Sequence, residues 1–102
     1  AIAIKRNNYQ VWYNRGNSLF SLKRYEDAAA SYNRAIRYKP DYYESWYSRG
    51  NAFFNMQRFQ DAIASYERAI KLKPDYQQAI NALKALQTQQ QQPQQPQQPQ
   101  QM

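Results

Sequence analysis

The chain contains no cysteine, no histidine and only two glycines among its 102 residues. Without cysteine and histidine it can form no disulfide, no thiolate or imidazole metal site and no catalytic group of either type. Two glycines are also too few for the glycine-rich loops that hold phosphates. The sequence therefore predicts no catalytic residue, no metal site and no cofactor.

Long apolar runs are missing as well, and no charged, then apolar, then small-residue leader opens the sequence. A membrane-spanning helix needs about 20 consecutive apolar residues, and a secretory signal has that three-part pattern. We therefore expect no membrane association for this segment and, by default, a cytoplasmic protein.

Positive charge is in excess, with 14 Lys and Arg against 7 Asp and Glu and a net charge of +7. Such a charge suits a polyanion or an acidic peptide. Six of these 14 cations, however, lie in the last turns of two predicted helices, where they complement the helix dipole. They are Arg34, Arg37, Lys39, Arg68, Lys71 and Lys73. This placement favours a structural role over nucleic-acid binding.

The most informative pattern is a repeat of 34 residues. Residues 9–42 and 43–76 align without a gap and are identical at 20 of 34 positions. A period of this length is typical of solenoids, in which each unit buries its apolar face against the next. Apolar residues recur at helical spacing over about 9–22 and 25–38, and Pro40 ends the second segment. The sequence predicts an all-α fold, an α-solenoid of helix-turn-helix repeats.

Partial elements flank the two repeats. Residues 1–8 open with AIAIK, which matches AIRYK and AIKLK near the ends of the repeats, so we expect the last turn of a preceding repeat's second helix. That reading predicts a chain that begins inside a unit. Residues 77–88 start like a third repeat but lose its Trp and Gly, as a capping helix would.

Residues 89–102 are rich in Gln and Pro and carry no charge. We expect a tail that is disordered or extended as polyproline II. Pro93, Pro96 and Pro99 form PxxP twice without a basic flank. This composition favours an inert spacer over an SH3 ligand.

Two local patterns recur with the repeat. Asn7, Asp41 and Asp75 are each followed three residues later by Gln or Glu, which predicts a capping box at each first helix. Gly16 and Gly50 lie in the middle of helices, where glycine costs roughly 1 kcal/mol relative to alanine. We expect each glycine to allow a close crossing of two helices, with Ala28 opposite the first and Ala62 opposite the second.

The spacing of Trp, Gly, Ala, Tyr, Ala and Pro resembles the signature of the tetratricopeptide repeat family. The matching residues are Trp12, Gly16, Leu19, Tyr25, Ala28, Tyr32, Ala35 and Pro40, then Trp46, Gly50, Phe53, Phe59, Ala62, Tyr66, Ala69 and Pro74. Arg15 and Arg49 stand where a Leu is usual, and we expect their stems to pack while their charged heads stay in water. The resemblance implies two complete repeats and a non-catalytic interaction module.

The resemblance also points to a binding surface on the first helices. In the family this face lines a concave groove that holds an extended peptide or short helix of a partner protein. The residues it would place there are Gln10, Tyr13, Asn17, Phe20, Glu44, Tyr47, Asn51 and Phe54. The competing interpretation is that the two Phe pack between units and the two Asn bond within the array.

One subclass of the family grips the C-terminal carboxylate of chaperone peptides through a Lys, two Asn and a basic pair. Asn17 matches one of these positions, but Tyr13, Ser48, Gln78 and Ala82 occupy the others. The sequence therefore predicts that this clamp is absent and disfavours a chaperone tail as the partner.

Three functions remain open. The leading interpretation is a protein-protein interaction module that binds a partner peptide or helix in the groove. The second is self-assembly, either by end-to-end stacking at the uncovered N-terminal face or by exchange of residues 1–5 between chains. The third is the C-terminal regulatory region of a larger signalling enzyme.

Overall fold

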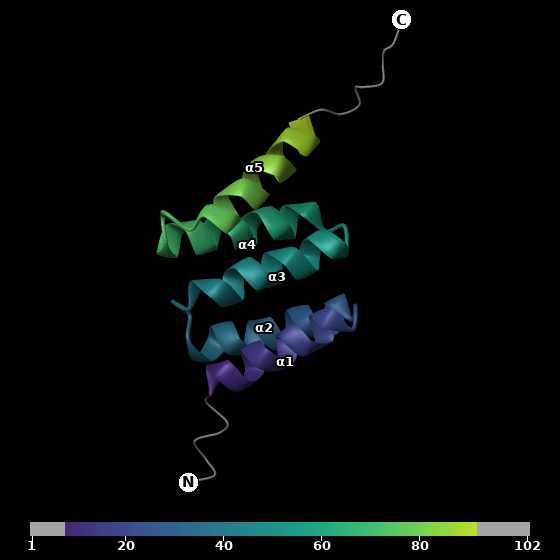
Figure 1. The fold of residues 1–102 in the computed structure, drawn as a ribbon, viewed down its shortest axis with the longest axis vertical. Coiled ribbons are helices and arrows are strands. Elements are labelled where there is room, and N and C mark those ends of the chain that lie inside the picture. The colour runs from purple at the N-terminus through teal and green to yellow at the C-terminus, as the bar shows by residue number, and fades with distance from the viewer. Residues whose placement is uncertain (1–7, 92–102) are drawn as a thin grey trace, which may run out of the picture.

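The computed structural model describes residues 8–91, which form five α-helices stacked in a row in chain order (Figure 1). The helices are α1 (Tyr9–Ser21), α2 (Tyr25–Tyr38), α3 (Tyr43–Asn55), α4 (Phe59–Leu72) and α5 (Gln77–Gln91). Each helix packs mainly on its neighbours in the sequence. The all-α solenoid predicted from the sequence is confirmed.

The element boundaries are close to those expected. Helix α5 continues to Gln91, three residues beyond the predicted capping helix, because glutamine favours helix about as well as most straight side chains. The predicted remnant at residues 1–7, with the cap at Asn7, lies outside the described residues. So does the tail from residue 92 onward.

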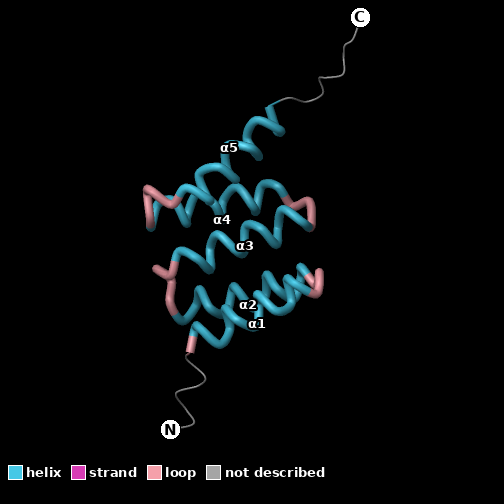
Figure 2. Tube along the Cα trace, viewed as in Figure 1, coloured by secondary structure: helices cyan, strands magenta, loops and turns pink. Residues whose placement is uncertain are grey.

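The turns alternate between the two sides of the stack, with the α1–α2 and α3–α4 turns on one side and the α2–α3 and α4–α5 connections on the other (Figure 2). Helix α1 ends in a Schellman motif, in which the Arg24 amide donates to the Leu19 carbonyl and the Lys23 amide to the Phe20 carbonyl, both at 2.9 Å. This motif needs a left-handed residue, and Lys23 has φ 63°. Gln57 repeats the conformation with φ 61° after α3.

The helix caps differ from the predicted capping boxes. Asn8 caps α1, since its Oδ1 accepts from the Gln10 amide at 2.9 Å. The N-cap of α3 is Tyr42, which makes no side-chain cap hydrogen bond, so the box predicted at Asp41 is wrong. The Asp41 carboxylate instead lies 3.1 Å from Lys39 Nζ, and the hydrogen bond from Lys39 lowers the pKa of that carboxyl.

The close crossing at each glycine is made by an aromatic ring. A Cβ built on Gly16 would lie 2.5 Å from Tyr32 Cε1, and its three nearest atoms all belong to Tyr32. Gly50 has the same relationship to Tyr66 at 2.6 Å. The glycines therefore make room for a buried tyrosine of the partner helix, whereas the alanine predicted opposite Gly16, Ala28, is not among these nearest atoms.

Arg49 is also placed differently from the prediction. Its guanidinium lies 4.9 Å from the Trp46 ring centre and donates to Ser65 Oγ at 3.0 Å and to Asn33 Oδ1 at 2.8 Å. Desolvation lowers the pKa of this guanidinium. The charged head of Arg49 is thus half-buried and hydrogen-bonded, and it joins α3 to α4 and to α2.

Candidate functional site

The eight residues predicted to line a groove form two matching rows, which we call the first-helix stripe. Gln10, Tyr13, Asn17 and Phe20 follow one another at helical spacing on α1, and Glu44, Tyr47, Asn51 and Phe54 do so on α3. Side chains at such intervals lie on one face of a helix. The two rows share one chemistry, since each offers an aromatic ring, an amide and a second aromatic ring in the same order.

Tyrosine rings gather around the beginning of this stripe. Tyr13 lies 5.9 Å from Tyr32 and 5.2 Å from Tyr42, measured between ring centres. In the second repeat the corresponding distances from Tyr47 are 5.8 Å to Tyr66 and 5.2 Å to Tyr76. Tyr13 and Tyr47 are consequently only half exposed. Part of each ring supports the fold, and part is open to a ligand.

Burial changes the acidity of these tyrosines. It raises the pKa of Tyr32 to about 12, with the neighbouring Tyr13 adding to the effect. Burial likewise raises the pKa of Tyr76, and Tyr47 and Glu44 contribute in the same direction. These hydroxyl groups remain protonated at neutral pH and act there as hydrogen-bond donors or acceptors.

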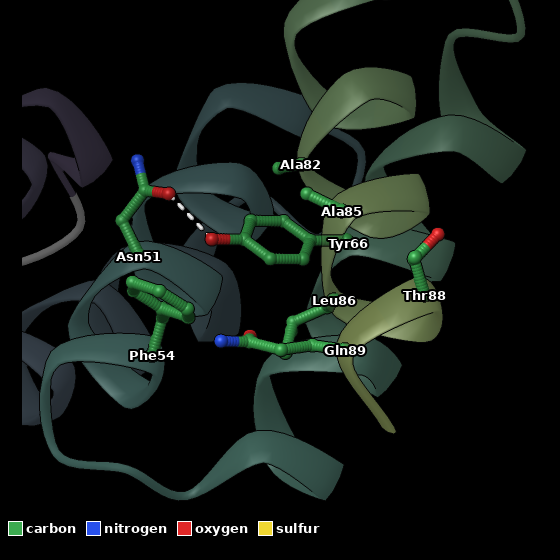
Figure 3. Close-up of a pocket in the computed structure, with 8 residues that line it drawn as sticks. All are labelled: Asn51, Phe54, Tyr66, Ala82, Ala85, Leu86, Thr88 and Gln89. Carbon is green, nitrogen blue, oxygen red and sulfur yellow. Dashed lines mark hydrogen bonds between the residues drawn. The ribbon is translucent and has the colours of Figure 1, made fainter. Parts of the chain in front are cut away.

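The two asparagines of the stripe each receive a hydrogen bond from a buried tyrosine. The Tyr32 hydroxyl donates to Asn17 Oδ1 at 2.7 Å, and the Tyr66 hydroxyl donates to Asn51 Oδ1 at 2.6 Å. Figure 3 shows the amide nitrogen of Asn51 pointing away from Tyr66. Because each tyrosine hydroxyl donates to Oδ1, it sets the orientation of the asparagine amide. The Nδ2 group can then donate to another partner. The asparagines therefore bond within the array, as the competing interpretation predicted, and their role in a groove stays a prediction.

The two phenylalanines differ in exposure. Phe20 packs against Tyr25 at 5.1 Å between ring centres and is half-buried, whereas Phe54 contacts Phe59 at 5.8 Å but remains 42% exposed. The contact of Phe20 lies within the first repeat, so it is a packing residue but not the contact between units that the competing interpretation predicted. Phe54 is available to a ligand.

A cavity of about 570 Å³ opens where α3, α4 and α5 meet (Figure 3). Its lining includes Asn51 and Phe54 of the predicted stripe. The other lining residues were not predicted to bind a partner: they are Tyr66, Ala82, Ala85, Leu86, Thr88 and Gln89. The small side chains at 82 and 85, one helical turn apart on α5, are the sequence signal that could have revealed this space.

The stripe and the cavity contain very little charge. Glu44 is the one charged residue among the eight stripe positions, and the cavity lining has none. Glu44 lies close enough to Tyr42 and Tyr76 to help raise the pKa of both phenols, after the larger effect of burial. It also helps to raise the pKa of Lys73, whose main partner is Asp75 at 3.1 Å.

Many of the cations lie outside the stripe and have local partners. Arg34 lies 4.9 Å from the centre of the Trp12 ring, and Arg68 lies 5.4 Å from that of Trp46. Lys39 Nζ approaches Asp41 at 3.1 Å. The sequence predicted that these basic residues complement the helix dipole. The structure adds stacking on tryptophan and pairing with aspartate, which are structural roles of another kind.

These features define a class of protein: a short α-helical repeat array whose first helices carry aromatic and amide side chains, with a cavity where α3, α4 and α5 meet. The tetratricopeptide repeat model matches residues 1–41 and 13–76. The chain belongs to the tetratricopeptide repeat family.

Solved structures show the same fold. A structure entitled the first TPR of Spaghetti (RPAP3) bound to the HSP90 peptide SRMEEVD has 29% sequence identity and a TM-score of 0.79, covering 81% of this chain and 66% of that chain. The first TPR domain of human RPAP3 has 30% identity and a TM-score of 0.77, and the match covers 79% of this chain and 64% of that chain. MamA is similar at 22% identity with a TM-score of 0.82, with 83% and 50% covered.

The chain thus spans about two thirds of the RPAP3 chains and half of the MamA chain. No curated protein shows a significant sequence match. Among the described helices, none has both the length and the apolar character needed to cross a membrane. Residues 8–91 contain no cluster of acidic side chains suited to a metal ion.

Proposed function

We propose that this chain is a non-catalytic protein-interaction module that holds a segment of a partner protein along the first-helix stripe. The observation that carries the proposal is the cavity of about 570 Å³ at the end of the stripe, bordered by the exposed ring of Phe54. Rigid aromatic rings beside amide donors are the usual chemistry of a protein-binding surface.

The comparison with RPAP3 supports the general mode of binding. Its first TPR domain was solved with a bound heptapeptide, SRMEEVD, and matches this chain over most of its length. The carboxylate clamp is missing here because Tyr13, Ser48, Gln78 and Ala82 hold the positions of its Lys, Asn and basic pair. The partner of this chain therefore differs in chemistry from an acidic chaperone tail.

The test begins with a random peptide library displayed on phage and selected on the immobilised chain. Enriched peptides are then titrated calorimetrically against the wild type and against Phe54→Gln. We expect Phe54→Gln to weaken binding by more than fivefold, because burial of an aromatic anchor commonly contributes more than about 1 kcal/mol. Leu22→Gln is the control, since Leu22 is 67% exposed and lies outside the stripe. Failure to enrich any peptide, or equal loss in both variants, contradicts the proposal.

Substitution of Tyr13 and Tyr47 by alanine is a weaker test of binding, although both residues lie on the stripe. Each ring contacts two other tyrosines, so truncation also lowers stability. Substitution at Phe54 separates binding from folding better because that ring is more exposed.

A second candidate function is self-association through the N-terminal end of the stack. A cavity of about 430 Å³ lies there, lined by residues that include Trp12, Arg15, Ala30 and Arg34. In the second repeat the matching Trp46 donates from Nε1 to the Pro40 carbonyl at 2.8 Å, and Arg49 reaches Asn33. Within residues 8–91 no helix covers the first repeat as α2 covers the second.

Sedimentation velocity over a concentration series tests this alternative. Ala30→Arg fills the cavity mouth, and Ala64→Arg places the same change at the matching position of α4, where both alanines are exposed. If the chain self-associates, its sedimenting mass should rise with concentration in the wild type and in Ala64→Arg, but not in Ala30→Arg. A constant monomer mass throughout the series eliminates this candidate.

A further inference from the structure

We propose that the groove selects a partner segment with an apolar side chain and, about three to five residues away, a lysine or arginine. The apolar side chain would enter the cavity beside Phe54, and the cation would lie next to Glu44. This inference rests on the proposed function and gives the chemistry of the ligand.

The cavity favours an apolar anchor. Leu86 forms a buried base that is 1% exposed, and Ala82 and Ala85 leave space that longer side chains would fill. Figure 3 shows Phe54 and Gln89 on opposite sides of this space, with the Tyr66 ring between the helices. A leucine-sized or aromatic side chain placed there would remove apolar surface on both partners from water, which is favourable.

The beginning of α3 favours a cation. Glu44 is half-buried among tyrosines. The nearby ion pairs Lys39–Asp41 and Lys73–Asp75 each contribute one positive and one negative charge. Three carboxylates and two ammonium groups therefore leave a local excess of one negative charge. A partner cation would neutralise that excess.

The tyrosines add a second attraction for a cation. Lys39 Nζ lies 5.6 Å from the ring centre of Tyr9, and Lys73 Nζ lies 5.6 Å from that of Tyr43. Tyrosine rings in this part of the molecule thus already hold ammonium groups through cation–π contacts. Tyr47 and Tyr76, 5.2 Å apart beside Glu44, offer the same chemistry to a ligand.

The spacing follows from helix geometry. The cavity is bordered on α3 by Asn51 and Phe54. They follow Glu44 by seven and ten residues, which corresponds to about 10 to 15 Å at roughly 1.5 Å per residue. An extended peptide rises about 3.3 Å per residue, so about three to five residues separate the two contacts. An acidic side chain at the same place would be repelled by Glu44, and the stripe contains no cation that could bind it.

The experiment uses the peptides enriched from the random library on the wild-type chain. We expect them to share an apolar residue and a Lys or Arg about three to five positions apart. In a second selection on Glu44→Lys, we expect the basic residue to disappear or to be replaced by Asp or Glu. Enrichment of acidic peptides on the wild type, or an unchanged preference on Glu44→Lys, overturns this inference while leaving the interaction module in place. No enrichment at all overturns both.

Affinity measurements with one enriched peptide complete the test. Glu44→Gln should weaken binding about two- to fivefold, the range for an exposed ion pair, and added salt should reduce the difference. Glu67→Gln is the matched control, because it removes the same charge from an exposed position of α4 outside the stripe. Ala85→Gln, which fills the cavity, should weaken binding more than Glu44→Gln does. Equal affinities for Glu44→Gln and Glu67→Gln, with circular dichroism showing both folded, would exclude the role of Glu44.

Discussion

Arg49 in α3 donates a hydrogen bond of 2.8 Å from Nη1 to Oδ1 of Asn33 in α2, and so connects one repeat to the next. The same guanidinium reaches Ser65 of its own repeat and covers the Trp46 ring. A charged side chain has thus taken a position where the family usually has leucine. The contact between repeats is partly polar as a result.

This arrangement predicts how Arg49 tolerates substitution. Arg49→Leu should change the free energy of unfolding by less than about 1 kcal/mol, because an apolar side chain of similar reach avoids the desolvation of the guanidinium. Arg49→Ala should cost about 1–3 kcal/mol, since it removes both the packing and the hydrogen bonds. Urea denaturation followed by circular dichroism measures both values. A loss for Arg49→Leu as large as that for Arg49→Ala would show that the charge itself stabilises the array.

The contact between Gly16 and Tyr32 predicts a second result. Gly16→Ala should destabilise the chain by about 1–2 kcal/mol even though alanine favours helix by roughly 1 kcal/mol, because the new methyl group overlaps the buried ring. Ser18→Ala, at an exposed position of the same helix, should be neutral or stabilising. The cost of Gly16→Ala should disappear in a Tyr32→Leu background. If it persists there, the ring does not explain the glycine.

The left-handed turn residues predict a gain of stability. Lys23→Gly should raise the free energy of unfolding by about 0.5–1 kcal/mol, because glycine adopts a φ of 63° without the strain of a side chain. Gln57→Gly should act similarly in the second repeat. Lys23→Ala keeps the strain and serves as the control in thermal unfolding. A stability equal to that of the alanine variant would contradict this account of the turn.

Ser45 predicts a gain of stability of similar size. Its hydroxyl is buried and has no hydrogen-bond partner among the described residues. Ser45→Ala removes this desolvated group and should stabilise the chain by about 0.5–1 kcal/mol. Ser48→Ala is a useful comparison, because Ser48 lies on the same helix and approaches the Tyr32 hydroxyl. Both variants can be compared by urea denaturation, and a loss on Ser45→Ala would show that its hydroxyl is bonded.

The buried tyrosines predict a loss of stability in alkali. The pKa of Tyr32 is about 12 in the folded chain and about 10 in an unfolded one. The unfolded chain therefore loses this proton at a lower pH than the folded chain does. The contribution of Tyr32 to the free energy of unfolding is complete below about pH 10 and is lost as the pH rises toward 12. Burial raises the pKa of Tyr66 and Tyr76 as well, which acts in the same direction.

Urea midpoints across this pH range, with tyrosinate absorbance measured in parallel, test the prediction. Tyr32→Phe should make the decline shallower, because one titrating group is removed. If all ten tyrosines ionise together near their ordinary pKa and the urea midpoint stays constant, the linkage is absent.

Much of the fold is encoded locally. Trp12 and Trp46, 34 residues apart, set the repeat, and the helical spacing of small and aromatic residues predicts the four helices of the two repeats. Pro40 and Pro74 mark the ends of the second helices because proline cannot continue a helix. These signals depend on backbone preferences and on residues close in the sequence, so they can be read without a structure.

The site was less predictable. Asn51 and Phe54 were expected in the groove and do line the cavity, but the contribution of α5 was missed because its position depends on how it packs against α4. Asp41 looked like a helix cap, yet Lys39 competes for its carboxylate. Such choices between two polar partners are small energy differences that a residue pattern does not reveal.

The amino-acid sequence by itself determined that this protein is an array of helical hairpins, because a 34-residue period and matched apolar stripes allow little else. Only the tertiary structure decided which side chains of the stripe remain open. Tyr32 and Tyr66 bond to asparagines 15 residues before them in the chain, and their rings fill the space that Gly16 and Gly50 leave. These contacts form when one helix is laid against another, and that packing separates the residues that hold the fold from those free to bind.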